Sequence, residues 1–141
     1  MNYGTKYYRI QAWEQGAVVR VFKTKWFGRF ARQERLSDQK LANAVREIEK
    51  GLHDGDLGGN LIKKRMARAG EGKRGGYRTI LVYHRGMRAV FVYGFAKSDK
   101  DNLSPVELRE YQKAAQVYLH LSEADIGKAL QEIDYDEEVP Q

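Results

Sequence analysis

The sequence predicts an α+β domain in which helices cover a small, mainly antiparallel sheet of about four strands. Runs rich in β-branched and aromatic residues, typical of strands, occur near the start and in the middle of the chain. Segments with apolar residues at helical spacing stand before and after the middle runs. Residues 84–87 (HRGM) separate the last two runs and suit a tight hairpin, which joins antiparallel neighbours.

The N-terminal half predicts one strand and two helices. Residues 18–22 (VVRVF) form the first strand, and residues 24–35 have apolar side chains on one helical stripe. Ser37 is a suitable N-cap for a second helix that extends through Gly51. The glycine-rich residues 53–60 (HDGDLGGN) are then expected to form a loop.

Three strands are predicted next, over residues 61–68, 77–84 and 88–96. The last two are almost continuously apolar, without the polar alternation of a half-exposed strand. We therefore expect these two strands to lie in the centre of the sheet.

Helices are predicted again toward the C-terminus. Ser104 is an N-cap, a proline occupies the first helical position, and Glu107 completes a capping box. Ser122 begins a last short helix that runs through Ile133. Residues 134–141 form an acidic tail.

The composition excludes several classes of protein. The chain has no cysteine, so disulfides, thiol catalysis and cysteine-ligated zinc are excluded, and a reducing cytoplasm is the expected location. No run of about 18 apolar residues is present, so neither a membrane span nor a membrane partner is expected.

Basic residues are concentrated in one part of the chain. The net charge is +6 for the whole sequence, but +12 for residues 1–122 and −6 for residues 123–141. Residues 60–100 alone contain eleven basic and two acidic side chains. This distribution suits a polyanionic partner, although basic charge also serves solubility alone.

The densest basic segment is residues 61–77, LIKKRMARAGEGKRGGY. Side chains alternate along a strand, so if its apolar residues face inward, Lys63 and Arg65 share the exposed face. Lys64 and Arg68 have the inward parity and are expected to emerge at the sheet edge or the strand end.

Further candidates surround the glycine-rich turn. The turn carries Lys73 and Arg74, Arg78 opens the following strand, and Lys97 and Lys100 follow the last strand. Clustered cations on rigid strands beside a glycine-rich loop suit a phosphate backbone better than a small uncharged ligand. Three tyrosines are placed where a ring or a hydroxyl can meet a nucleotide: Tyr77, Tyr93 and Tyr111.

The sequence does not satisfy the requirements of the common nucleotide-binding and metal-binding motifs. Residues 70–75 (GEGKRG) match the glycine pattern of dinucleotide-binding loops, but a strand follows them instead of the required helix. The same segment lacks the Ser or Thr of a P-loop. The three histidines, His53, His84 and His120, share no metal-ligand spacing. No cofactor and no metal are therefore predicted.

Taken together, the motifs resemble those of the RelE/ParE superfamily of toxins from type II toxin–antitoxin modules, in particular its HigB-type, RelE-like branch. The resemblance covers residues 19–121 and rests on VFKTKWFGRFARQERLS, DLGGNLIKKRMARAGEGKRGGYRTILVY and FVYGFAKSDKDNLSPVELREY. It implies the small RelE-like fold. It also implies a ribosome-dependent endoribonuclease that cuts mRNA by attack of the substrate's own 2′-hydroxyl, without a metal.

The resemblance also implies which residues act. The family's paired basic residues before the glycine turn fall on Lys63 and Arg65, and its arginine in the Tyr-Arg step falls on Arg78. Its basic position after the last strand falls on Lys97, with Lys100 as the alternate. Since arginine keeps its proton at any useful pH, general-base catalysis falls on Lys63 or a tyrosine.

Some members of the superfamily carry a catalytic tyrosine near the C-terminus, and Tyr111 is the candidate for this role in the present chain. The other residues of the basic region are expected to hold mRNA or ribosomal RNA. This RNA-binding set comprises Lys64, Arg68, Lys73, Arg74, Tyr77 and Lys100.

The expected partners also come from the resemblance. They are the ribosome, mRNA and a cognate antitoxin from the neighbouring gene, with a helix-turn-helix through which the complex contacts operator DNA. Two alternatives remain open. One is a ParE-like toxin that inhibits gyrase and cuts no RNA, and the other is a non-catalytic RNA-binding module of the same fold.

The two ends extend beyond a minimal toxin core, because the toxin-like match begins near Val19 and residues 122–141 add a short helix and the acidic tail. Valine can be encoded by the alternative start codon GTG, so residues 1–18 are predicted to result from an overlong start assignment. The intact mass of the protein expressed from its native locus tests this prediction, and a mass corresponding to Met1 to Gln141 contradicts it.

Overall fold

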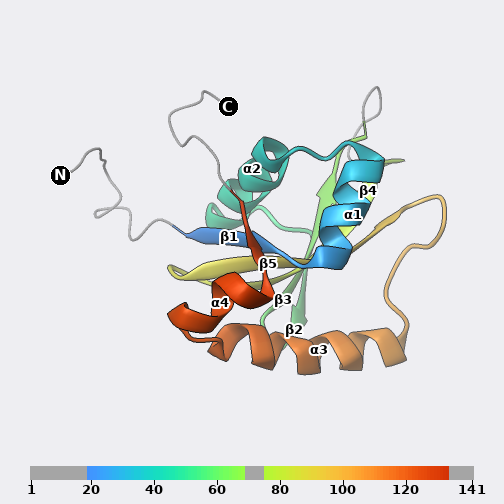
Figure 1. Cartoon of the computed structure of the whole chain (residues 1–141). Helices are drawn as coiled ribbons and strands as arrows, with labels where there is room; N and C mark the ends of the chain where they lie inside the picture. The colour runs from blue at the N-terminus through green and yellow to red at the C-terminus, as the bar shows by residue number, and fades with distance from the viewer. Residues whose placement is uncertain (1–18, 69–74, 134–141) are drawn as a thin grey trace.

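The computed structural model describes residues 19–68 and 75–133, which form four helices and one six-stranded sheet. Helices α1 and α2 lie on one face of the sheet, and α3 and α4 lie on the other (Figure 1). The α+β class is therefore confirmed, as a three-layer arrangement. In chain order the elements are β1 (Arg20–Lys23), α1 (Lys25–Glu34), α2 (Asp38–Glu49), β2 (Gly55–Gly58), β3 (Leu61–Met66), β4 (Tyr77–His84), β5 (Arg88–Ala96), α3 (Pro105–His120), α4 (Glu123–Ala129) and β6 (Gln131–Glu132).

The strand order is β2-β3-β4-β5-β1-β6. The pairs β2–β3, β3–β4, β4–β5 and β1–β6 are antiparallel, whereas β1 runs parallel to β5. The expectation of a mainly antiparallel sheet with β4 and β5 at its centre is confirmed. The expected number of strands is too low, because β2 and β6 are not apparent in the sequence pattern.

Strand β2 lies where the sequence predicts a loop, so that prediction is wrong. Gly55 pairs with Lys63 and Gly58 pairs with Leu61 on the outer edge of β3. Gly58, Gly59 and Asn60 have positive φ angles and reverse the chain between the two strands. Backbone hydrogen bonding to an existing edge needs no β-branched side chains, which is why a glycine-rich segment forms this strand.

The last helix ends earlier than predicted. Helix α4 stops at Ala129, Leu130 has an extended backbone, and Glu132 of β6 pairs with Phe22 of β1. The Arg20 guanidinium donates two hydrogen bonds of 2.8 Å to the Glu132 carboxylate. The free edge of β1 therefore takes up residues that local pattern alone assigns to a helix.

The sheet buries apolar side chains on both faces. One cluster lies under α1 and α2 and includes Phe27, Leu41 and Phe91. The other lies under α3 and α4 and includes Ile80 and Ile126. Coverage of both faces explains why the central strands β4 and β5 are almost continuously apolar.

The start of α3 is formed as its sequence predicts. The Ser104 hydroxyl accepts the Glu107 N–H at 3.1 Å, and the Glu107 carboxylate accepts the Ser104 N–H at 2.8 Å. Pro105 follows the cap at the first helical position. This capping box fixes the end of α3 that lies beside the basic strands.

Replacing Gly76 with alanine is expected to destabilise the fold by about 1–3 kcal/mol, because the added Cβ would overpack the junction between β3 and β4. That Cβ would lie 2.2 Å from the Met66 carbonyl oxygen and 2.8 Å from the Arg68 nitrogen, both backbone atoms. Urea unfolding measures the change. The control is Gly127→Ala in α4, where nothing lies within 4 Å, so helix propensity should stabilise the protein. Equal effects at the two sites would contradict this prediction.

Candidate functional site

Three predicted cations share the sheet face that α3 covers. In β3, Ile62 and Met66 belong to the cluster under α1 and α2, so Lys63 and Arg65 point to the opposite face. Arg65 lies directly opposite Arg78 in the register of β3 and β4. The predicted parity of Lys63 and Arg65 is thus confirmed. Like charges at directly opposed positions are unfavourable, which suits a site that receives an anion.

Each of these three side chains has a different environment. The Lys63 ammonium donates a 2.8 Å hydrogen bond to Asn102 Oδ1, and none of the ion pairs formed among residues 19–68 and 75–133 involves it. The Arg65 guanidinium lies 3.9 Å from the Asp54 carboxylate. Arg78 is only 3% exposed. Lys63 is therefore held by a neutral partner.

Lys100 extends this group from the loop between β5 and α3. Its ammonium lies 5.2 Å from the ring centroids of both Tyr93 and Phe95. It donates to both carboxylate oxygens of Glu107 at 2.7 Å. Because Phe95 of β5 is paired with Arg78 of β4, Lys100 lies over the strand next to the one that carries Arg78. We call Lys63, Arg65, Arg78 and Lys100 the cation cluster.

The ion pair between Lys100 and Glu107 shifts the pKa of each group in the direction expected for opposite charges. The hydrogen bond to Glu107 raises the pKa of Lys100. The same bond, together with the Ser104 N–H, lowers the pKa of Glu107 below its ordinary value. Both side chains are about one-third exposed, so the energy of this pair is reduced by solvent screening.

Tyr111 of α3 covers the aromatic side of the cation cluster. Its ring stacks on Tyr93 with centroids 5.1 Å apart and planes inclined by 21°. Burial and the neighbouring Tyr93 raise the pKa of Tyr111 to about 12. Its hydroxyl keeps its proton near neutral pH, so it can donate a proton or hydrogen bond but is a poor base.

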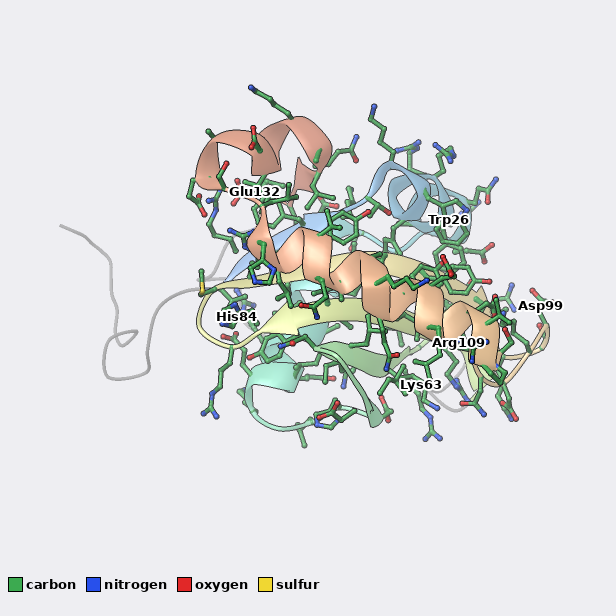
Figure 2. All side chains as sticks on the ribbon, turned by 90° about the horizontal axis from the view of Figure 1, so that it is seen from below. Trp26, Lys63, His84, Asp99, Arg109 and Glu132 are labelled. Atoms are coloured by element: carbon green, nitrogen blue, oxygen red, sulfur yellow. The ribbon has the colours of Figure 1, made fainter. Side chains whose placement is uncertain are left out.

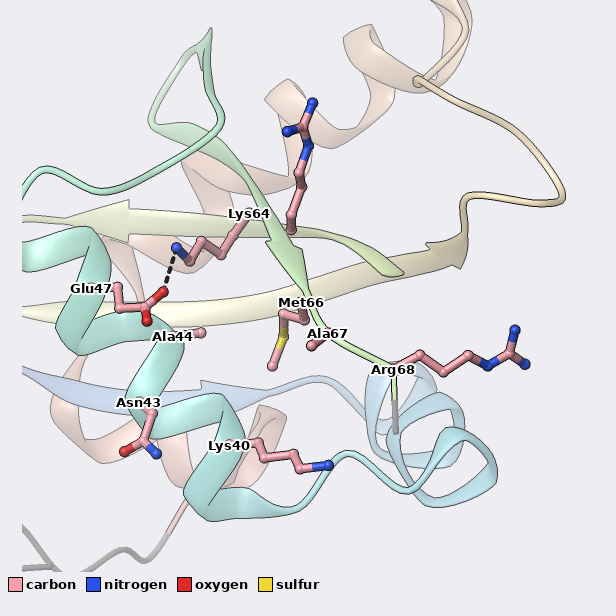
Figure 3. A pocket seen from close by; sticks show the side chains of 9 residues that line it. Lys40, Asn43, Ala44, Glu47, Lys64, Met66, Ala67 and Arg68 are labelled. Carbon is pink, nitrogen blue, oxygen red and sulfur yellow. Dashed lines mark ion pairs between the residues drawn. The ribbon is translucent and has the colours of Figure 1, made fainter. Parts of the chain in front are cut away.

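Lys64 does not emerge at the sheet edge, so that expectation is wrong. It is 4% exposed, and its ammonium lies 2.6 Å from a Glu47 oxygen and donates to the Leu52 carbonyl at 2.8 Å. Figure 3 shows Lys64 extending from β3 toward Glu47 of α2, on the wall of a cavity of about 270 Å³. A buried ammonium needs such partners, and they hold Lys64 on the α2 side of the sheet, away from the face that carries Lys63.

Tyr77 and Arg68 also lie apart from the cation cluster. Tyr77 is 2% exposed, and its hydroxyl donates to Glu34 of α1 at 2.6 Å. The ring is part of the core under α1 and does not lie with the cation cluster, so its role as a nucleotide contact stays a prediction. The Arg68 guanidinium stacks over Tyr77 at 5.4 Å and lies 3.9 Å from Glu34. Arg68 still offers an exposed cation, as Figure 3 shows, but on the side of α1 and α2.

Lys97 is not a member of the cation cluster. It lies beyond β5, with its ammonium 4.0 Å from Asp101 instead of over the rings that Lys100 contacts. Lys100, the alternate, is thus the one placed in the cluster. The two predicted cations of the glycine-rich turn, Lys73 and Arg74, lie outside the described residues.

Sequence reasoning did not single out Asn102 and Glu107 as site residues. Asn102 holds Lys63, and Glu107 holds Lys100. Glu107 was visible only as a capping residue, and the hydrogen bond from Lys63 to Asn102 joins residues 39 positions apart in the chain. Only pairing of the strands and placement of α3 bring these groups together.

The Lys100–Glu107 pair gives a prediction for acid stability. A carboxylate whose pKa is lowered on folding stabilises the protein above its unfolded pKa, and this stabilisation is lost as the pH falls through the lowered value. Glu107→Gln keeps an oxygen for the Ser104 N–H but removes the charge, so its unfolding free energy should depend less on pH. The expected difference is at most about 1 kcal/mol. Urea unfolding near neutral pH and at about pH 3 measures it, and parallel pH profiles would refute the assignment.

The described residues form neither a metal-binding cluster nor a membrane-spanning helix. No group of three or more His, Asp or Glu side chains within residues 19–68 and 75–133 is arranged to hold a metal ion. In the same part of the chain, no helix has the length and apolar character needed to span a membrane.

Comparison with known proteins identifies the family. The model of the RelE family, described as the RelE toxin of the RelE/RelB toxin–antitoxin system, matches residues 19–137. No curated protein matches the sequence. The family match spans β1 through β6 and includes every member of the cation cluster. The chain therefore belongs to the RelE toxin family of toxin–antitoxin systems.

Proposed function

We propose that this toxin is a ribosome-dependent mRNA endoribonuclease whose active site is the cation cluster together with Tyr93 and Tyr111. The observation that carries the proposal is the convergence of four cations from β3, β4 and the loop before α3 on one sheet face. A stacked tyrosine pair lies against the same cations. Cations and partly exposed aromatic rings together suit a single RNA strand, which has both phosphates and bases.

The proposed reaction uses the substrate's own 2′-hydroxyl. Its oxygen bonds to the adjacent phosphorus while the bond from phosphorus to the 5′-oxygen breaks, which leaves a 2′,3′-cyclic phosphate and a 5′-hydroxyl. Lys63 takes the proton of the 2′-hydroxyl, and Tyr111 gives a proton to the departing 5′-oxygen. Burial and the neighbouring Tyr93 raise the pKa of Tyr111 to about 12, so its hydroxyl carries the proton that this role needs.

The other cations stabilise the charge that develops on phosphorus. Arg65 and Arg78 are adjacent across β3 and β4, and we assign both guanidinium groups to the equatorial oxygens of one phosphorane. Because Arg78 is 3% exposed, its guanidinium must move out of its buried position to make this contact. Lys100 supplies a further positive charge and must exchange part of its interaction with Glu107 for the phosphate. Arg68, Lys97, Lys73 and Arg74 are proposed to hold mRNA or ribosomal RNA outside the reacting centre.

Family membership implies a cognate antitoxin. We propose that it is encoded next to this gene and carries a helix-turn-helix, so that the toxin reaches operator DNA only within the complex. We also propose that the chain acts in the cytoplasm, where ribosomes and mRNA are available.

Tightly controlled expression, followed by mapping of mRNA 5′ ends, tests the proposal. Rapid loss of translation with cuts within codons, reproduced by purified protein on mRNA-programmed ribosomes, is the expected result. DNA breaks with an SOS response and intact mRNA would instead indicate a gyrase inhibitor. An absence of both effects would indicate a non-catalytic RNA-binding module.

A further inference from the structure

Trp26 is a large apolar side chain that the fold leaves exposed. It lies in the first turn of α1, next to Phe27, which is fully buried in the core. Trp26 itself is 41% exposed. Phe30 stacks nearly parallel to the indole, with centroids 5.6 Å apart and planes inclined by 11°. The indole is therefore held in place by a neighbour while much of its surface faces solvent.

The indole also continues the aromatic part of the proposed active site. Its centroid lies 5.0 Å from that of Tyr93, which in turn stacks on Tyr111. We call Trp26, Tyr93 and Tyr111 the aromatic row. It is assembled from three separate elements, α1, β5 and α3. The register of β4 and β5 shifts next to Tyr93, as at a β-bulge. This irregularity explains why two consecutive residues, Val92 and Tyr93, both contribute to the cluster under α3.

The Lys100 ammonium lies close to this row. The Lys100 ammonium and the Trp26 ring both lie about 5 Å from the Tyr93 ring, so they are separated by no more than about 10 Å. Trp26, Lys63 and Asp99 all lie toward the same end of the molecule in Figure 2. A nucleotide with its phosphate at Lys100 can therefore extend its base toward the indole.

From these contacts we infer that Trp26 is a base-stacking subsite, which holds one unpaired nucleobase of the mRNA beside the scissile phosphate. The inference rests on the proposed ribonuclease function and adds a specific contact to it. Stacking on an indole uses the π-face that every base has, so this subsite positions the strand without selecting a particular base. Phe30 fixes the orientation of the indole, which lowers the entropy lost when a base stacks on it.

Cleavage of mRNA on programmed ribosomes by Trp26 variants tests the subsite. Trp26→Ala should lower kcat/KM by about 5- to 150-fold, the range expected for loss of one base–aromatic stack. Trp26→Phe should restore part of the loss because it keeps a ring. The matched control is Met87→Ala, an exposed apolar residue in the hairpin between β4 and β5, which should cleave like the unmodified protein.

A double-substitution cycle separates stacking from a structural effect. The mRNA carries an abasic ribonucleotide at one position of the codon at a time, which retains the 2′-hydroxyl and the phosphate. At one position, removing the base should slow the unmodified toxin about as much as Trp26→Ala does, and should have little further effect on that variant. A merely destabilised variant would instead lose the same factor with every RNA.

The outcomes distinguish this inference from the proposed function. If the unmodified toxin cleaves and Trp26→Ala cleaves equally well, the subsite is overturned and the ribonuclease function stands. If Trp26→Ala weakens only binding of the antitoxin, the indole belongs to that interface and the subsite is again overturned. If the unmodified toxin does not cleave, the same abasic cycle is applied to equilibrium RNA binding. If Trp26→Ala and removal of the base have coupled effects on RNA binding, the subsite is supported even without nuclease activity. If the two effects simply add, the subsite is rejected.

Discussion

Replacing Arg78 with alanine is expected to lower the rate of mRNA cleavage by about 10²–10³-fold, the effect of removing one preorganised donor from a developing oxyanion. Arg78 of β4 lies opposite Arg65 of β3, on the sheet face that also carries Lys63. Arg78→Lys should recover only part of the rate, because an ammonium cannot bind two phosphate oxygens with planar geometry. Single-turnover cleavage on programmed ribosomes measures both variants.

The burial of Arg78 makes a matched control necessary. Arg88 is an equally buried arginine, at 4% against 3% exposure, in the neighbouring strand β5. Its guanidinium donates to the Tyr118 and Leu121 carbonyls at 2.9 Å and so holds the far end of α3. Arg88→Ala should destabilise the fold while each folded molecule still cleaves normally. If Arg78→Ala behaves in the same way, Arg78 is structural and the proposed role is wrong.

Replacing Lys63 with glutamine is expected to lower the cleavage rate by about 10²–10⁴-fold, the range for loss of a general base. The change should leave stability almost unaltered, since the Lys63 ammonium is bound by the neutral Asn102 and not by a buried carboxylate. Lys63→Arg distinguishes two explanations, because arginine retains the charge but does not give up its proton. Activity close to normal in Lys63→Arg would show that the residue acts by charge alone.

The adjacent lysine is the control for this experiment. Lys64 points to the opposite face and is paired with Glu47 under α2. Lys64→Gln removes the charge that compensates Glu47 and should cost about 1–3 kcal/mol of stability, with normal cleavage per folded molecule. Lys63→Gln should therefore lose activity and keep its stability, whereas Lys64→Gln should lose stability and keep its activity. Reduced cleavage by folded Lys64→Gln would place Lys64 in the RNA-binding set after all.

Short sequence patterns correctly predicted the structural features that depend on residues close together in the chain. The capping box of Ser104 and Glu107 begins α3, and the hairpin of residues 84–87 joins β4 to β5. Alternation along β3 correctly placed Lys63 and Arg65 on one face. Each of these features depends on residues within a few positions of one another, where backbone geometry alone relates the side chains.

Other features depend on what the rest of the fold supplies. Residues 53–60 contain β2 because β3 offers an edge, and residues after Ala129 join the sheet because β1 offers another. Lys64 and Tyr77 look like surface residues by type, yet Glu47 and Glu34 satisfy their polar atoms within the fold. Residue type gives no indication of such partners, because burial of a polar group depends on groups distant in sequence.

Sequence patterns alone were sufficient to predict the α+β class, the basic character of the central segment and the shared face of Lys63 and Arg65 on β3. Which of the predicted residues lie together could be read only from the folded chain. In the fold, Arg65 lies opposite Arg78, and Lys100 rather than Lys97 lies over the Tyr93 ring. Asn102, Glu107 and Trp26 contact Lys63, Lys100 and Tyr93, respectively. The physical reason is that periodicity assigns a side chain to a face, whereas a site requires side chains from several elements within a few ångströms.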